Sequence, residues 1–183
     1  MKLLRSIRLD PSDTFIFASA AEPGEFAVAG SFAFWDEDVL NLRGKRAAAF
    51  RAGFLGLTSG GFSTLAQVCV ADDVMMTQAE EQLAALLARD HGAPDIERAR
   101  DAAREEIAAT AAIADHAEGT LIAMRRFIDD AGEIREQFRT LHRRASNEGG
   151  ADPRHYRAFI FFDDETTEAE MVDFDALAKG RSA

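Results

Sequence analysis

The chain has 183 residues, a length that fits one domain and can bury a sizeable core. Its formal net charge of −11 disfavours binding to nucleic acid or to an anionic membrane, because both require a basic surface. The single cysteine excludes an internal disulfide and a zinc site built from cysteines, so we expect a reducing compartment.

The first 35 residues predict three strands. Apolar and polar residues alternate over 3–9, and a turn at 10–13 separates this strand from a second short one at 14–18. The third strand, 25–35, has large side chains on one face and small ones on the other, with Gly30 marking a bulge or a close neighbour. We expect the large face to meet the core, and the small face to meet a second layer or form a shallow groove.

The middle of the chain predicts three helices around one buried strand. The first helix runs over 41–52 with Asn41 as its N-cap, and the near-continuous apolar run at 62–70 is typical of a buried strand. A capping box at 77–80 begins the second helix. Pro94 stands at the first position of the third, which continues with helical spacing to Ala114.

The last third of the chain is less regular. A strand is predicted at 120–128 and another at 156–162, with a linker signal at 146–150. The segment 134–143 has apolar residues at helical spacing, although the turn before it also permits a hairpin strand; we expect a short helix. Residues 163–175 carry seven acids and no base.

The order of these elements predicts an α+β fold. Three strands before any crossover argue against a doubly wound sheet. We therefore expect a single antiparallel or mixed sheet of about five to six strands, with helices packed mainly on one face. Residues 1–162 would form one globular domain, and 163–183 an acidic C-terminal helix or tail; whether 146–155 is ordered stays open.

The glycine-rich segment 51–65, RAGFLGLTSGGFSTL, is the main candidate site. It fails as a Walker A loop, as a dinucleotide fingerprint and as a nucleophile elbow, either in residue identity or in the order of flanking elements. Two interpretations remain: a helix C-cap followed by a tight turn, or an anion-binding nest of backbone N–H groups. The residues of the nest would be Thr58, Ser59, Gly60 and Gly61, with Arg51 nearby.

Trp35, the only tryptophan, is the second candidate, because a tryptophan at the end of a strand can stack on a ligand or partner. Arginines at 125–126 and 135–144 form the one basic region, which would receive an acidic partner or the acidic segment 163–175, or would pair with neighbouring acids. No pattern predicts a catalytic residue, a metal site or a cofactor.

Four sequence stretches resemble an uncharacterised family of small acidic proteins from alphaproteobacteria. They are FAFW (32–35), AAFRAGFLG (48–56), GFSTLAQV (61–68) and IREQFRTL (134–141). The resemblance implies no activity and no site. It agrees with the bacterial source that the excess of arginine over lysine indicates.

We expect a cytoplasmic protein, because the N-terminal MKLLRSIRLD is interrupted by charges and no apolar run approaches the roughly 18 residues of a membrane span. The leading hypothesis is a non-enzymatic binding or accessory protein with a protein partner. One alternative is a small enzyme or anionic-ligand-binding domain that uses the 56–61 loop. Another is a homo-oligomer, such as a homodimer, joined through an exposed strand edge.

Overall fold

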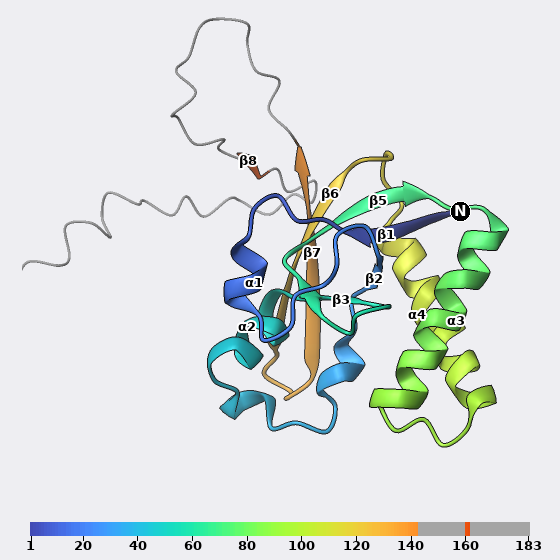
Figure 1. Cartoon of the computed structure of the whole chain (residues 1–183). Coiled ribbons are helices and arrows are strands. Elements are labelled where there is room, and N and C mark those ends of the chain that lie inside the picture. Colours follow the sequence, from blue (N-terminus) through green and yellow to red (C-terminus); the bar gives the residue numbers. More distant parts are fainter. Residues whose placement is uncertain (143–159, 162–183) are drawn as a thin grey trace, which may run out of the picture.

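The computed structural model of the protein describes residues 1–142 and 160–161. These residues form one antiparallel sheet with helices around it (Figure 1). The strands are β1 (Lys2–Ser6), β2 (Phe26–Val28), β3 (Phe54–Gly56), β4 (Phe62–Ser63), β5 (Leu65–Val70), β6 (Leu121–Ile128), β7 (Ile134–His142) and β8 (Ile160–Phe161). The α-helices are α1 (Ser12–Ile16), α2 (Gly44–Ala52), α3 (Asp73–Asp90) and α4 (Ile96–Ile113), and the 3-10 helices are η1 (Ser31–Phe34) and η2 (Val39–Asn41).

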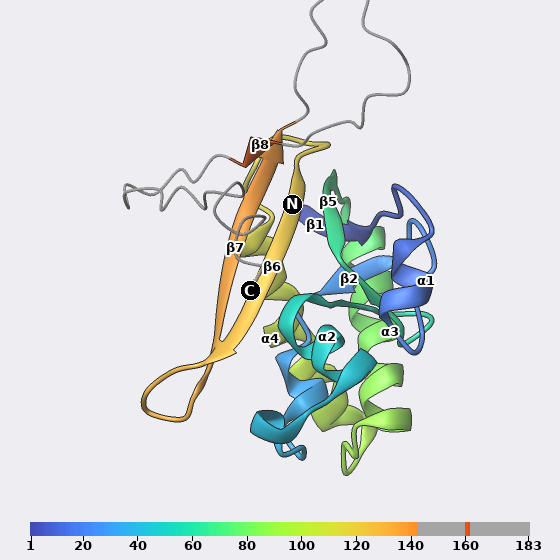
Figure 2. The same cartoon turned by 90° about the vertical axis from the view of Figure 1, so that its left-hand side faces the viewer.

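The strand order is β4-β3-β2-β1-β5-β6-β7-β8, and every neighbouring pair is antiparallel. The expected α+β class with a single sheet is confirmed. The expected strand count of five to six is too low, because the described residues hold seven strands up to position 142 and the two-residue β8. The β6–β7 hairpin is the longest ladder and extends past the body of the protein in Figure 2.

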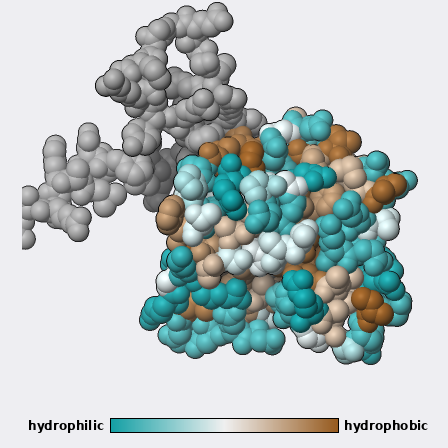
Figure 3. Space-filling model, in the orientation of Figure 1, coloured by the Kyte–Doolittle hydropathy of each residue, from teal (hydrophilic) through white to brown (hydrophobic). Residues whose placement is uncertain are grey.

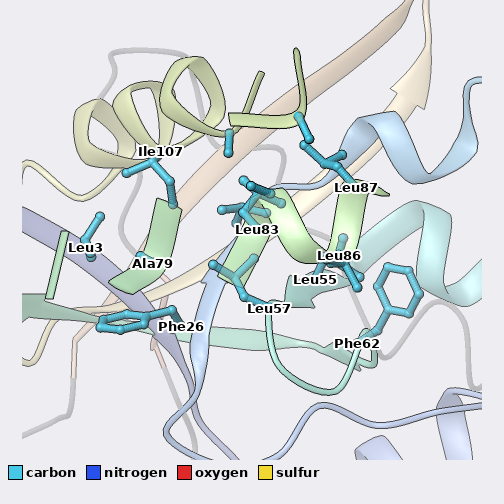
Figure 4. Packing of buried hydrophobic residues seen from close by; sticks show 14 of the residues in the cluster. Leu3, Phe26, Leu55, Leu57, Phe62, Ala79, Leu83, Leu86, Leu87 and Ile107 are labelled. Carbon is cyan, nitrogen blue, oxygen red and sulfur yellow. The ribbon is translucent and has the colours of Figure 1, made fainter. Parts of the chain in front are cut away.

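The first of two hydrophobic clusters lies between the sheet and the helix pair α3–α4. Leu83 and Leu86 of α3 and Ile107 of α4 are buried against Leu55 and Phe26 of the sheet (Figure 4). Every third or fourth residue of each helix faces the sheet, which is the spacing of an amphipathic helix. This burial is the main source of stability for a fold of this size.

The second cluster occupies the opposite face of β1, β2 and β5. Leu4 and Ala27 pack there with Ile122 of the hairpin. The sheet curves so strongly that Phe54 of β3 and Phe138 of β7, which have four strands between them, place their ring centroids 6.3 Å from each other. Of the small face predicted for the third strand, Ala27 and Ala29 pack in this cluster.

The predicted strand 25–35 is mostly wrong, because β2 ends at Val28. Gly30 adopts a φ of 71°, and a Cβ there would lie 2.7 Å from the Cβ of Leu55. The chain therefore turns away from the sheet into η1, which carries Phe34 into the core and leaves Trp35 after it.

Two other strand predictions fail near Asp13. The segment 14–18 is not a strand, because most of it belongs to α1. The predicted strand 62–70 is interrupted at Thr64, whose backbone N–H and hydroxyl both donate to the buried Asp13 carboxylate, at 3.3 and 2.9 Å. Because the Thr64 N–H donates to a side chain, it cannot donate to a neighbouring strand, and the run divides into β4 and β5.

The predicted helix 134–143 is wrong, because this segment is β7 and pairs with β6 over eight positions. The turn at 129–132 favours a strand over a helix here, because the Asp129 carboxylate accepts hydrogen bonds from the backbone N–H groups of Ala131 and Glu133 and closes a β-hairpin. Asn41 does not cap α2, since it lies in η2 and α2 begins at Gly44. The predicted linker at 146–150 and the acidic segment 163–183 lie outside the described residues.

Within the part of the chain described, no helix combines the length and apolarity needed to cross a bilayer. The face in Figure 3 is mostly hydrophilic, and its hydrophobic residues form small separate groups.

Candidate functional site

In the loop proposed as a nest, the backbone N–H groups of Thr58 and Ser59 donate to a carboxylate of the protein itself, whereas those of Gly60 and Gly61 donate to the Gly56 carbonyl and the Ser59 hydroxyl. Glu25 Oε2 accepts hydrogen bonds from the backbone N–H groups of Thr58 and Ser59, at 2.7 and 2.9 Å. Its Oε1 accepts from the Ser59 hydroxyl at 2.5 Å and from the backbone N–H of Glu22 at 2.6 Å. Consecutive N–H groups therefore converge on an anion, as such turns do, and the anion is internal.

The glycines of this loop allow the close approach. A Cβ on Gly56 would lie 2.4 Å from Glu25 Oε1, and one on Gly61 would lie 2.5 Å from the backbone carbonyl of Ala20. Gly60 has a φ of 66°, which an L side chain rarely adopts. The glycine pattern thus reflects backbone geometry and space for Glu25.

The structure does not bring the predicted site residues together. Thr58, Ser59, Gly60 and Gly61 share one loop, and Arg51 is exposed in the last turn of α2. Trp35 lines a separate pocket to which no residue of 51–61 contributes.

This second site is an open groove of about 620 Å³ between η1 and the start of β7. It is lined by Ser31, Trp35, Glu133, Ile134, Arg135 and Glu136. Trp35 is 73% exposed, which is unusual for the largest aromatic residue. Arg135 is held by Asp129 and Glu133, with N···O distances of 2.6 and 2.9 Å, so its charge is compensated by neighbouring carboxylates.

A buried arginine lies behind the groove. Arg126 of β6 has a side chain with no exposed surface. Its Nη1 donates to the carbonyl of Phe50 at 2.8 Å and its Nη2 to the carbonyl of Ala29 at 2.5 Å. Its Nε donates to Glu136 Oε1 at 2.7 Å. One guanidinium therefore ties together the end of α2, the chain after β2 and strand β7.

Aromatic rings complete the surroundings of Arg126. Its Cζ lies 5.3 Å from the ring centroid of Phe34 and 5.8 Å from that of Phe50. Arg46, which is paired with Glu37, places its Cζ 4.3 Å from the same Phe34 ring. Phe34 thus makes cation–π contacts with two arginines, which fixes the η1 segment directly before Trp35.

Glu106 of α4 adds a second carboxylate to this buried cluster. Burial raises the pKa of Glu106, and the nearby Glu136 raises it further. The Gly30 N–H, which donates to Oε1 at 3.1 Å, and the charge of Arg126 oppose this shift. Burial lowers the pKa of Arg126, against the effect of Glu136 and Glu106, and a guanidinium in such a setting stays protonated.

Glu136 belongs to both features, since it pairs with Arg126 and lines the groove. Its side chain is 21% exposed, so one carboxylate joins the buried cluster to the open surface. The arrangement holds η1 and β7 on either side of the groove. Among the residues described, no group of three or more histidines, cysteines and carboxylates is placed to hold a metal ion.

Reasoning from the sequence places Arg126 in a basic region with Arg125 and misses its burial, and it does not single out Glu106 or Glu136. A signal for Arg126 was present: on the predicted strand 120–128 it shares the face of Ile122 and Met124, so period-two alternation points it inward. Glu136 had no such signal, because its segment was predicted to be a helix.

A family model matches residues 1–149, which is most of the chain. The chain belongs to DUF6505, a family of unknown function. This confirms the expectation of an uncharacterised family. The comparison with curated proteins and the comparison with solved structures each gave no match.

Proposed function

We propose that this protein is a non-enzymatic binding protein whose groove beside Trp35 takes a cationic segment of a protein partner. The observation that carries the proposal is the exposed Trp35 side chain on a groove held in place by buried ionic contacts. Tryptophan is strongly enriched among the residues that dominate binding energy at protein interfaces.

The charges around the groove support a cationic partner. Glu133 and Glu136 line one side, and the exposed Asp36 and Asp38 follow Trp35 on the other. The only lysine or arginine in the lining is Arg135, which is already paired. Glu133 and Glu136 are themselves paired with Arg135 and Arg126, whereas Asp36 and Asp38 form no ion pair within the described residues. A lysine or arginine would therefore meet the Trp35 ring for cation–π contact and these two aspartates for ion pairing. The net charge of −11 would steer such a partner toward the protein.

We further propose that the protein works in a bacterial cytoplasm. The single cysteine and the arginine- and alanine-rich composition support this setting.

An anionic ligand at the 58–61 loop is the second candidate function. The converging donors favour it, but such a ligand has to replace the Glu25 carboxylate. We therefore place the Trp35 groove first. A homo-oligomer formed through a strand edge has no comparable observation in its favour.

Calorimetric titration with a short lysine–leucine repeat peptide tests the proposal. Trp35→Ala should weaken binding by about 30-fold, which corresponds to about 2 kcal/mol at an interface hot spot. Phe15→Ala is the matched control, because Phe15 is also an aromatic with 73% exposure but does not line the groove. Equal binding by wild type and Trp35→Ala would contradict the proposal.

A further inference from the structure

The η1 segment, which ends directly before Trp35, packs against the end of helix α3. Phe32 of η1 and His91, the C-cap residue of α3, meet edge to face, with ring centroids 5.1 Å apart and an interplanar angle of 85°. Phe32 also packs against the first hydrophobic cluster, and His91 is half-buried. A ring that can take up a proton therefore lies in the contact that holds η1 to the body of the protein.

Arg46 of α2 holds the same segment and carries a positive charge that acts on His91. Its Nη2 donates to the carbonyl of Ala33 at 2.7 Å, and its Cζ lies over the ring of Phe34. These contacts and the ion pair with Glu37 fix the guanidinium in place. A proton on His91 would therefore add a second positive charge near one that is already fixed beside η1.

The packed arrangement favours the neutral imidazole. Burial lowers the pKa of His91, and the charges of Arg46 and Arg89 lower it further. Asp90 and the negative end of the α3 dipole oppose the shift, but Asp90 is already paired with Arg89. Because the folded-state pKa lies below the ordinary value of 6.5, the contribution of this contact to stability is fully present above pH 6.5. It is lost as pH falls from there through the folded-state pKa.

We propose that His91 is a pH-sensitive latch for the Trp35 groove: protonation of its imidazole releases η1 from the end of α3 and loosens the side of the groove that carries Trp35. The inference rests on the proposed function of this groove. The proton comes from water and adds to the neutral ring, so no other reactant is needed. Ser31 and Trp35 line the groove from this segment, so release of η1 moves them relative to β7 and weakens binding of a cationic partner.

The chain before η1 stays in place when the latch opens. Arg126 donates to the carbonyl of Ala29, and Glu106 accepts from the N–H of Gly30. Neither contact involves His91. The turn at Gly30 is therefore the hinge, and the change is confined to the residues that follow it.

Amide hydrogen exchange of the free full-length protein tests the latch without a ligand. The N–H groups of Ala33 and Trp35 donate within η1 to the carbonyls of Gly30 and Phe32, at 3.2 and 3.3 Å. Their protection, relative to an unstructured chain at the same pH, should fall about threefold or more between about pH 7.5 and about pH 5.5, the range in which histidine titrates. Constant protection over this range would overturn the proposal.

Two histidine variants assign the effect. His91→Phe keeps an aromatic ring but cannot be protonated, so it should abolish the fall in protection of η1. His91→Gln, which also cannot be protonated, should abolish it too. His116→Phe is the matched control, because His116 is exposed at the end of α4, and it should behave as wild type. The same fall in both His91 variants would overturn the proposal, and unchanged protection of β1 and β5 amides shows that the variants remain folded.

Calorimetric titration with the lysine–leucine peptide separates the latch from the proposed function. Wild-type affinity should fall by about threefold to tenfold over the same pH range, and the affinity of His91→Phe should not. Glu106, whose pKa is raised, is present in both proteins, so the difference between them isolates His91. Binding by wild type that is independent of pH would overturn the latch and leave the groove as a binding site. Absence of binding at every pH would overturn the proposed function, whereas a loss of η1 protection that requires His91 would still support the latch.

Discussion

Replacing Arg126 with methionine should strongly destabilise the protein. The change removes a charged donor from the carbonyls of Phe50 and Ala29 and from the Glu136 carboxylate. Hydrogen bonds to a charged group contribute about 1.5–3 kcal/mol each, or about 4.5–9 kcal/mol for three. The methionine variant also avoids the cost of removing a guanidinium from water on folding, which offsets several kcal/mol of this loss. We expect a net loss of about 3–5 kcal/mol, the usual cost of removing one member of a buried ion pair.

Urea denaturation of the full chain at neutral pH measures this loss. Arg104→Met is the matched control, since the side chain of Arg104 is 55% exposed and its ion pair with Asp101 lies on the surface of α4. Arg104→Met should lower the free energy of unfolding by about 0.5 kcal/mol or less. The double variant Arg126→Met/Glu136→Met should cost less than the sum of the single changes by at least about 1 kcal/mol, because the unpaired carboxylate is also gone. A cost of about 1 kcal/mol or less for Arg126→Met would refute the proposed role of the buried arginine.

Two further changes test the clusters behind the groove and around the loop. The pKa of Glu106 is raised above its ordinary value of 4.5, so the folded protein keeps this carboxyl protonated at pH values where the unfolded chain has lost the proton. This contribution to the free energy of unfolding is lost as pH rises through the folded-state pKa. Glu106→Gln removes the effect, so its stability relative to wild type, measured by urea unfolding, should increase between pH 4 and pH 7; a constant difference would argue against a raised pKa. Glu25→Ala removes the carboxylate from the 58–61 loop and should lower the free energy of unfolding by about 1–3 kcal/mol. In thermal unfolding, inorganic phosphate should stabilise this variant more than it stabilises wild type, because it can take the place of the missing carboxylate. Full stability of Glu25→Ala without phosphate would show that the nest contributes nothing.

The parts of the fold that the sequence predicts well are those with local signals. The helix predicted to begin at Pro94 and the strand predicted at 120–128 correspond to α4 and β6, because apolar spacing and turn residues mark them directly. Of the four residues proposed for the nest, Thr58 and Ser59 direct their backbone N–H groups at a carboxylate, but Gly60 and Gly61 do not.

The failures come from contacts between distant parts of the chain. Gly30 is required at the turn after β2 because Leu55, 25 positions later, leaves no space for a Cβ. The carboxylate in the nest comes from Glu25, more than 30 positions before the loop. The buried cluster joins Arg126 to carbonyls 76 and 97 positions earlier. Pairings over such separations leave no periodic trace in a single sequence.

The emission of Trp35 tests the central claim most directly, because it is the only tryptophan and its side chain is largely exposed. Titration of the wild-type protein with the lysine–leucine peptide should shift the emission to shorter wavelength and saturate, since the indole leaves water on binding. The matched glutamate–leucine peptide should produce no shift. An unchanged spectrum with the lysine peptide, or an equal shift with both peptides, would contradict a groove that selects a cationic partner.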